Sequence, residues 1–135
     1  MQTSSLEIEV VDSRKHMHTV FTSKILRSIK NKRTVFDGTY DGQIVIIKRF
    51  EDIFCRYHAS KEKYGLERLK DRCLSMPEVL LYGKDKEGNC ILILQKIKNA
   101  RDILDVISSS DEVKNAKAIL LKLFHYVAQM HQAGV

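Results

Sequence analysis

Lys48 stands out because its charge falls within an apolar strand. It lies in the segment from Val35 to Phe50, VFDGTYDGQIVIIKRF, which is typical of a short hairpin that leads into a strand. Because side chains alternate along a strand, Lys48 shares one face with Ile46 and Phe50. An ammonium group on such a face loses hydration and needs an anionic partner, from the protein or from a ligand. The alternative is a lysine near a strand end whose charge reaches water on its flexible stem.

A carboxylate that could pair with Lys48 lies on a helix that the sequence predicts over residues 59–73. The buried face of this helix is predicted from residues at helical spacing, namely Glu62, Leu66, Leu69 and Cys73. Glu67 points about 140° away from Glu62 by the same periodicity and is expected in solvent. The sequence therefore predicts that Lys48 and Glu62 lie on apolar surfaces that meet.

The other patterns predict an α+β fold with an antiparallel five-stranded sheet and one packed helix. Strands are expected at residues 21–27, 34–37, 43–50, 78–82 and 90–94. The turn Tyr40-Asp41-Gly42-Gln43 joins the second and third of these, since Asp-Gly readily adopts positive φ. The runs 44–47 and 91–94 are apolar on both faces, which is typical of buried central strands.

A final helix is predicted after a short helix at about residues 101–107. Ser109 and Glu112 have the spacing of a capping box, and Gly134 is a stop signal. An apolar stripe at helical spacing lies between them: Ala116, Ile119, Leu120, Leu123, Phe124, Val127 and Met130. This stripe needs a partner surface, and little of the chain remains to supply one. We therefore expect that the chain is cut from a longer protein.

Composition favours an anionic partner. The 23 lysines and arginines exceed the 17 acidic residues, which gives a net charge of +6, and five of these cations crowd together: Lys24, Arg27, Lys30, Lys32 and Arg33. No segment approaches the roughly 20 apolar residues that cross a bilayer, and the N-terminus lacks the layout of a secretory signal. The cytoplasm is the expected location.

Cysteine and histidine spacing predicts no metal site. The three cysteines are odd in number and widely spread, and Cys73 and Cys90 are expected to be small core residues with reduced thiols. His16 and His18 could share a metal on a strand, but no second cluster of ligands accompanies them. An exposed polar pair is the expected state of these two histidines.

The order of these elements resembles the N-terminal lobe of the protein-kinase-like superfamily. VFDGTYDGQIVIIK is similar to its V-Y-x-G…V-A-V-K pattern, and KEKYGLERLKDRCLSMPEVLLYG looks like the glutamate helix of atypical bacterial kinases. Among these families, the lipopolysaccharide kinases that phosphorylate heptose or Kdo sugars are the most similar. Residues 1–18 are expected to form a polar lead-in. The resemblance, which covers about residues 21–135, implies a kinase-like small lobe with its connector at 19–99 and the first helices of an incomplete large lobe at 100–135.

The resemblance also implies a nucleotide site. Lys48 matches the lysine that binds the α- and β-phosphates, and Glu62 matches its helix partner. Ile46 corresponds to the small residue beneath the adenine, and Leu94 to the residue at the back of that pocket. Simple core packing is the alternative for Ile46 and Leu94.

The connector completes the implied adenine site. Gln95 and Ile97 match the positions whose backbone carbonyl and amide meet the adenine edge, with core packing again the alternative for Ile97. The loop that carries glycines in kinases has none here. Its phosphate contacts would therefore come from side-chain cations, Lys30, Lys32 or Arg33. The alternative is that this loop is a solvated charge run.

No catalytic residue or metal ligand is expected in this chain. In the family, the base aspartate and the Mg²⁺ ligands follow a phrase like the MHQAGV at residues 130–135, so they are expected beyond Val135. No further metal-ligating residues accompany the three aspartates that precede this phrase, Asp102, Asp105 and Asp111. ATP and Mg²⁺ are the implied cofactors.

The expected function is that of an ATP-dependent phosphotransferase of the lipopolysaccharide or sugar-kinase type. Its acceptor would be a sugar or lipopolysaccharide, met at the cytoplasmic membrane face through peripheral contact. The alternative is a non-catalytic, pseudokinase-like binding protein that self-associates through the apolar stripe of the last helix. A basic nucleic-acid module is a third reading of residues 24–33, but the interleaved aromatic residues that such a module needs are missing. Nucleic acid is therefore not an expected partner.

Overall fold

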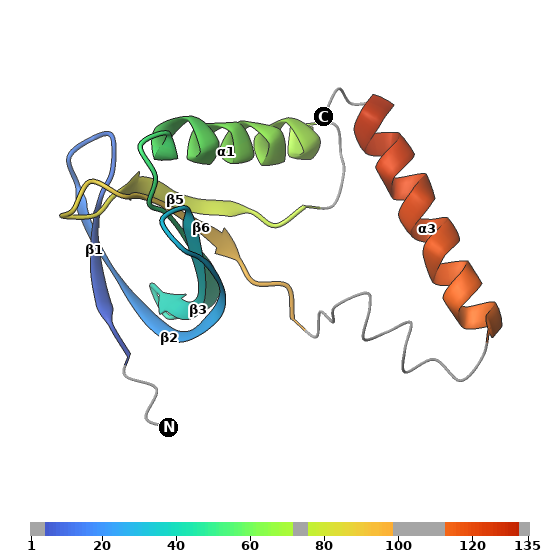
Figure 1. Ribbon diagram of the computed structural model, residues 1–135, viewed down its shortest axis with the longest axis horizontal. Helices are drawn as coiled ribbons and strands as arrows, with labels where there is room; N and C mark the ends of the chain where they lie inside the picture. Colours follow the sequence, from blue (N-terminus) through green and yellow to red (C-terminus); the bar gives the residue numbers. More distant parts are fainter. Residues whose placement is uncertain (1–4, 72–75, 99–112, 133–135) are drawn as a thin grey trace.

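The computed structural model describes residues 5–71, 76–98 and 113–132. Within them, six antiparallel strands close into a barrel in the order β1-β2-β3-β4-β6-β5, and the helix α1 lies along its outside (Figure 1). The elements are β1 (Glu7–Val11), β2 (Met17–Ile29), β3 (Arg33–Tyr40), β4 (Gln43–Phe50), α1 (Cys55–Asp71), β5 (Val79–Lys84), β6 (Cys90–Gln95) and α3 (Val113–Gln132).

The expected kinase-like small lobe with a five-stranded sheet is wrong, because a sixth strand closes the sheet into a barrel. This strand, β1, lies in the segment that we expected to be a polar lead-in. It pairs with β2 along its whole length and meets β5 at Val11 and Lys84. Ile8 and Val10 alternate with Glu7 and Glu9, so one face of β1 carries only these two apolar residues. A pattern this short does not identify a strand before its pairing partners are known.

A long, irregular second strand makes the closure geometrically feasible. The 13-residue β2 pairs with β1 through its first part and with β3 through its second part. Register shifts between Thr22 and Lys24 and between Ile25 and Arg27 interrupt its ladder with β3. Such irregularities bend a strand and increase its twist, which allows a small sheet to curl onto itself.

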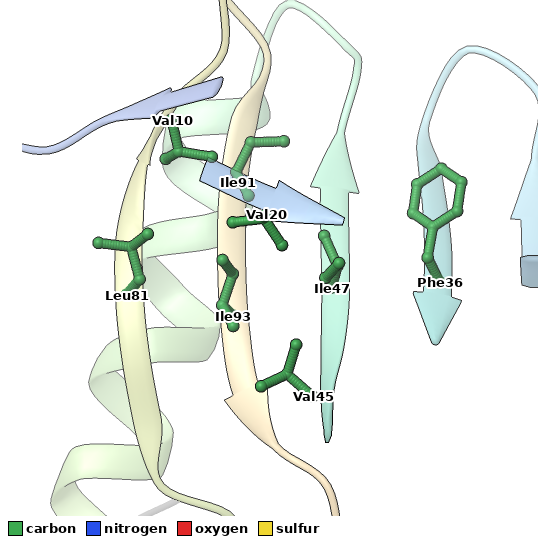
Figure 2. Packing of buried hydrophobic residues seen from close by; sticks show 8 residues of the cluster. All are labelled: Val10, Val20, Phe36, Val45, Ile47, Leu81, Ile91 and Ile93. Atoms are coloured by element: carbon green, nitrogen blue, oxygen red, sulfur yellow. The ribbon is translucent and has the colours of Figure 1, made fainter. Parts of the chain in front are cut away.

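The barrel interior is filled by eight buried side chains drawn from all six strands (Figure 2). They are Val10, Val20, Phe36, Val45, Ile47, Leu81, Ile91 and Ile93. β6 is buried on both faces, because Ile91 and Ile93 point into the barrel while Leu92 and Leu94 face α1. The prediction of a central strand at residues 91–94 is therefore confirmed.

The helix α1 begins at Cys55, four residues before its predicted start. Asp52 explains the difference, because its carboxylate accepts a hydrogen bond from the Phe54 amide at 2.6 Å and its carbonyl accepts one from Cys55 at 3.0 Å. These contacts satisfy backbone groups at the helix start. The helix buries Ala59 and Leu69 against the outer face of the barrel.

The predicted final helix is present as α3, and its apolar side chains remain largely uncovered. Leu121 and Phe124 are 60% and 65% exposed, while Tyr126 donates a 2.7 Å hydrogen bond to the Met76 sulfur. The short helix at 101–107, the capping box at Ser109 and Glu112, and Gly134 lie outside the described residues. None of the described helices has the length and apolar character needed to cross a membrane.

Candidate functional site

The structure brings Lys48 and Glu62 into contact. Lys48 lies on the outward face of β4, and its Nζ donates to Glu62 Oε1 on α1. Each side chain is 23% exposed, so both charges are partly withdrawn from water and remain reachable. Glu67 on the opposite face of α1 is 50% exposed and pairs with Lys63 at 3.1 Å, as the helical periodicity predicted.

Apolar packing surrounds this ion pair and fixes the helix over the strand. The second buried cluster of the protein consists of Phe50, Ala59, Cys90, Leu92 and Leu94, with Ile46, Cys55, Leu66, Val79 and Tyr82 packed at its edge. Val35 and Leu92 are the cross-strand partners of Lys48 on β3 and β6. Because α1 rests on β4, β5 and β6 through this cluster, the carboxylate of Glu62 is held over the strand that carries Lys48.

A cavity of about 560 Å³ adjoins the ion pair at the end of β4. Glu62 belongs both to the ion pair and to the cavity wall. The cations of this wall are Lys32, Arg33 and Lys61, its carboxylates are Asp52 and Glu62, and the His58 imidazole lies 3.6 Å from Asp52. Apolar side chains, among them Phe50, Leu66 and Leu69, form the rest of it. The cavity can therefore accept a ligand that has both an apolar part and an anionic part.

Two of the three cations of the wall, Lys32 and Arg33, come from a tight hairpin turn between β2 and β3, and Lys61 comes from α1. Asn31 adopts a positive φ of 59°, which substitutes for a glycine, and the Lys32 amide donates to the Ile29 carbonyl at 3.0 Å. The Lys32 carbonyl in turn accepts a 2.8 Å hydrogen bond from the Glu51 amide. The glycine-free loop at residues 28–33, which was expected to contact phosphates through its cations, contains a three-residue turn tied to the end of β4. Asn31 was the sequence signal for this turn, because asparagine tolerates a positive φ.

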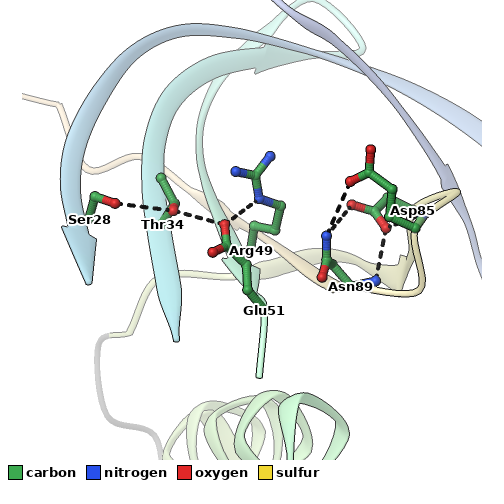
Figure 3. Close-up of polar contacts among 7 residues, drawn as sticks. Ser28, Thr34, Arg49, Glu51, Asp85 and Asn89 are labelled. Carbon is green, nitrogen blue, oxygen red and sulfur yellow. Dashed lines mark hydrogen bonds and ion pairs between the residues drawn. The ribbon is translucent and has the colours of Figure 1, made fainter. Parts of the chain in front are cut away.

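A polar network stiffens the base of the same hairpin (Figure 3). Glu51 Oε1 accepts hydrogen bonds from Thr34 Oγ1 at 3.0 Å and from Arg49 Nε at 2.8 Å. Ser28 Oγ lies 3.4 Å from Thr34 Oγ1 and continues the network to β2. These contacts hold three strands together beside the cavity, so Arg33 is displayed from a fixed backbone.

The predicted adenine-side residues lie at the other end of the outer face, apart from the cavity wall. Ile46 and Leu94 are cross-strand partners on β4 and β6, and both belong to the apolar cluster beneath α1. The Gln95 backbone amide donates a hydrogen bond to the Glu78 backbone carbonyl at 2.8 Å. The Ile97 side chain is 54% exposed. Core packing explains Leu94, which is 5% exposed. Lys30, in contrast, is exposed and does not line the cavity.

One contact at the connector was not predicted. Lys96 Nζ donates to Asp37 Oδ1 on β3 at 2.8 Å, across 59 positions of the chain. This ion pair ties the segment after β6 to the sheet. The two residues carry no shared local pattern, so the sequence offered no signal for the pairing.

His18 does not form the exposed pair with His16 that the sequence suggested. Its Nε2 lies 2.8 Å from Asp12 Oδ2, and its Nδ1 lies 2.9 Å from the Tyr40 hydroxyl, so both ring nitrogens have partners. The hydrogen bond from His18 is the largest cause that lowers the pKa of Asp12 below 3.8, and desolvation raises the pKa of Tyr40. Among the described residues there is no group of three or more His, Cys, Asp or Glu side chains that could hold a metal ion.

Comparisons of the chain with protein-family models, with curated proteins and with solved structures find no match. The function of the protein is therefore inferred from the residues themselves.

Proposed function

We propose that this chain is the nucleotide-binding part of an ATP-dependent phosphotransferase that acts on lipopolysaccharide or another sugar. The observation that carries this proposal is the ion pair between Lys48 and Glu62 beside a cavity with a basic wall. A partly desolvated ion pair contributes little net stability. Phosphate binding would explain the presence of this ion pair, since Glu62 would orient the Lys48 ammonium toward the phosphate oxygens.

The outer face of β4 supports an orientation of the nucleotide along this strand, with the phosphates toward its C-terminal end. Ile46, Lys48 and Phe50 follow one another on this face, over about 13 Å at the usual rise of a strand. In the proposal, the adenine lies at the edge of the apolar cluster, beside Gln95 and the exposed Ile97, while Ile46 and Leu94 support this edge from their packed positions beneath α1. The phosphates then pass Lys48 and end beside Arg33 and Lys32.

Lys30 and Mg²⁺ have different places in the proposal. Lys30 and Lys48 both lie outside the cavity wall, but Lys48 contacts the wall residue Glu62. The contribution assigned to the exposed Lys30 is the long-range attraction of an anionic ligand. The described residues contain no group of ligands that fits a metal ion, so we assign them neither a Mg²⁺ site nor a catalytic step. In the proposal the protein is cytoplasmic, and its net charge of +6 favours contact with the anionic inner face of a membrane, where lipopolysaccharide precursors would be met.

Calorimetric titration with ATP tests the proposal. The unmodified chain should bind ATP at least about tenfold more tightly than AMP, because the added phosphates meet the cations of the cavity. Lys48→Met should weaken ATP binding by about 10- to 100-fold, which corresponds to the loss of one charge-assisted hydrogen bond. Lys24→Met, which removes an exposed cation on β2, is the matched control. Equal ATP affinity in the Lys48 and Lys24 variants would refute the proposed contact between Lys48 and the phosphates.

The exposed apolar side chains of α3 favour a second candidate, a non-catalytic binding protein that self-associates. Leu121 and Phe124 are the most exposed of them. This candidate is expected to form dimers or larger assemblies in sedimentation experiments and to show no heat of binding with ATP. A monomer that binds ATP would contradict it.

A further inference from the structure

Two thiols that the proposed nucleotide site does not use face each other on the outside of the barrel. Cys55 is the first residue of α1, Cys90 is the first residue of β6, and their Sγ atoms lie 3.3 Å apart. A disulfide bond requires about 2.05 Å, so the two sulfurs must approach by only slightly more than 1 Å. We propose that Cys55 and Cys90 form a redox-active dithiol that closes to an intramolecular disulfide when the protein meets a peroxide.

The surroundings of the two thiols suit different roles in that reaction. Cys55 is partly exposed at the end of the helix, whereas Cys90 is completely buried. Burial, reinforced by the neighbouring Cys55, raises the pKa of Cys90 to about 11. Cys90 therefore stays a protonated thiol at neutral pH and is shielded from solvent. The peroxide meets Cys55 first, and Cys90 resolves the product.

The chemistry balances with hydrogen peroxide as the oxidant. The Cys55 sulfur attacks one peroxide oxygen, the O–O bond breaks, and Cys55 sulfenic acid and one water molecule form. The Cys90 sulfur then attacks the Cys55 sulfur, and the S–O bond breaks as the S–S bond forms. The sulfenic oxygen leaves as a second water molecule and takes the proton of the Cys90 thiol. Two thiols and one peroxide thus give one disulfide and two waters.

The bond would fasten the start of α1 to the first residue of β6. Ala59, one turn into the helix from Cys55, packs in the same buried cluster as Cys90, so the backbone at this end of α1 is already held close to β6. Two cysteines that served only as apolar core residues would have no need to place their sulfurs against each other. This inference does not depend on nucleotide binding, because neither thiol lines the cavity.

Peptide mapping tests the proposal on the full 135-residue chain. The reduced protein is treated with hydrogen peroxide, the remaining thiols are blocked with N-ethylmaleimide, and the protease digest is analysed by mass spectrometry. The expected product is a peptide pair that joins Cys55 to Cys90 and separates again with dithiothreitol. Cys73→Ser, which removes the third cysteine, should give the same pair in the same yield.

A second variant separates the proposed order of events from simple oxidation. In Cys55→Ser, the buried Cys90 should not be oxidised by the peroxide and should be found in the digest as an unoxidised, blockable thiol. Sulfinic acid on Cys55 without a joined peptide, a disulfide that involves Cys73, or only cross-linked dimers would overturn the proposal.

Discussion

Lys48 on β4 and Glu62 on α1 form an ion pair that links the outer face of the barrel to the helix covering it. The apolar side chains of the second buried cluster, which lies between β4, β6 and α1, fix the separation of these two elements. The pair therefore adopts its geometry before any ligand arrives. A preorganised cation of this kind avoids much of the reorganisation that a free lysine would undergo on binding phosphate.

Removing the Glu62 charge should reduce ATP binding although Glu62 does not contact the phosphates in the proposed complex. Glu62→Gln keeps the shape of the side chain but weakens its hold on the Lys48 ammonium. We expect about a tenfold loss of ATP affinity, since charged hydrogen bonds are roughly 1 kcal/mol or more stronger than neutral ones. Glu67→Gln, on the exposed face of α1, is the matched control and should change the affinity less than twofold, which we take as roughly the scale of a surface charge effect. The reverse order of these two effects in a calorimetric titration would contradict the assigned helix face.

The side-chain orientation on α1 and the β3–β4 hairpin could be predicted because their signals are local. Asp41 and Gly42 both have positive φ, 50° and 75°, as the Asp-Gly turn predicted. The buried Leu69 and the exposed Glu67 follow directly from the helical period. In both cases, residues within a few positions of each other determine the structure.

The barrel closure could not be predicted because it depends on a distant contact. Val11 meets Lys84 across 73 positions of the chain, and that single pair in the β1–β5 register is what converts an open sheet into a barrel. The start of α1 is a different case, because Asp52 is a recognisable capping residue two positions before Phe54. Its signal was present in the sequence and was missed.

Gly83 should be essential for the closure of the barrel. A Cβ atom at Gly83 would collide with the Val11 carbonyl oxygen and crowd a methyl group of Val10. Gly83→Ala is therefore expected to destabilise the protein by about 1–3 kcal/mol, the usual range for overpacking a tight contact. Urea unfolding followed by circular dichroism measures this change.

Gly65 provides the control for Gly83. It lies within α1, and a Cβ atom there would have no neighbour within 4 Å. Gly65→Ala should stabilise the protein by about 0.5–1 kcal/mol, because alanine restricts the unfolded chain and favours the helix. No effect of Gly83→Ala would show that the approach of β1 to β5 is misplaced. Destabilisation by Gly65→Ala would instead show that the space beside this position of α1 is occupied.

Asp12 should make the hairpin between β1 and β2 sensitive to acid. Its pKa is lowered from 3.8 in the folded protein, chiefly by the hydrogen bond with His18, so folding favours the ionised carboxylate. The resulting stabilisation is present above pH 3.8 and is lost as the pH falls through the lower folded-state pKa. Asp12→Asn should therefore be less stable than the parent protein at about pH 6, and the difference should shrink at about pH 3.

Asp41→Asn is the control for Asp12→Asn. Asp41 is exposed in the β3–β4 turn with positive φ, a conformation that asparagine tolerates equally well. The stability difference between this variant and the parent protein should stay constant, within about 0.5 kcal/mol, over the same pH range. A constant difference for Asp12→Asn as well would mean that the contact with His18 does not depend on the charge of Asp12.

Oxidation of the Cys55–Cys90 pair should raise the stability of the whole domain, because the bond would close a loop between residues 35 positions apart. In the chain-entropy model, cross-linking a loop of this length stabilises a protein by about 4 kcal/mol, less any strain in the folded state. The oxidised protein should therefore unfold at a higher urea concentration than the reduced protein, and Cys73→Ser should behave in the same way. The urea dependence of the unfolding free energy should also decrease, because the cross-linked unfolded chain exposes less surface. An oxidised form that unfolds at the same urea concentration as the reduced form would show that the bond strains the contact between α1 and β6 as much as it restrains the unfolded chain.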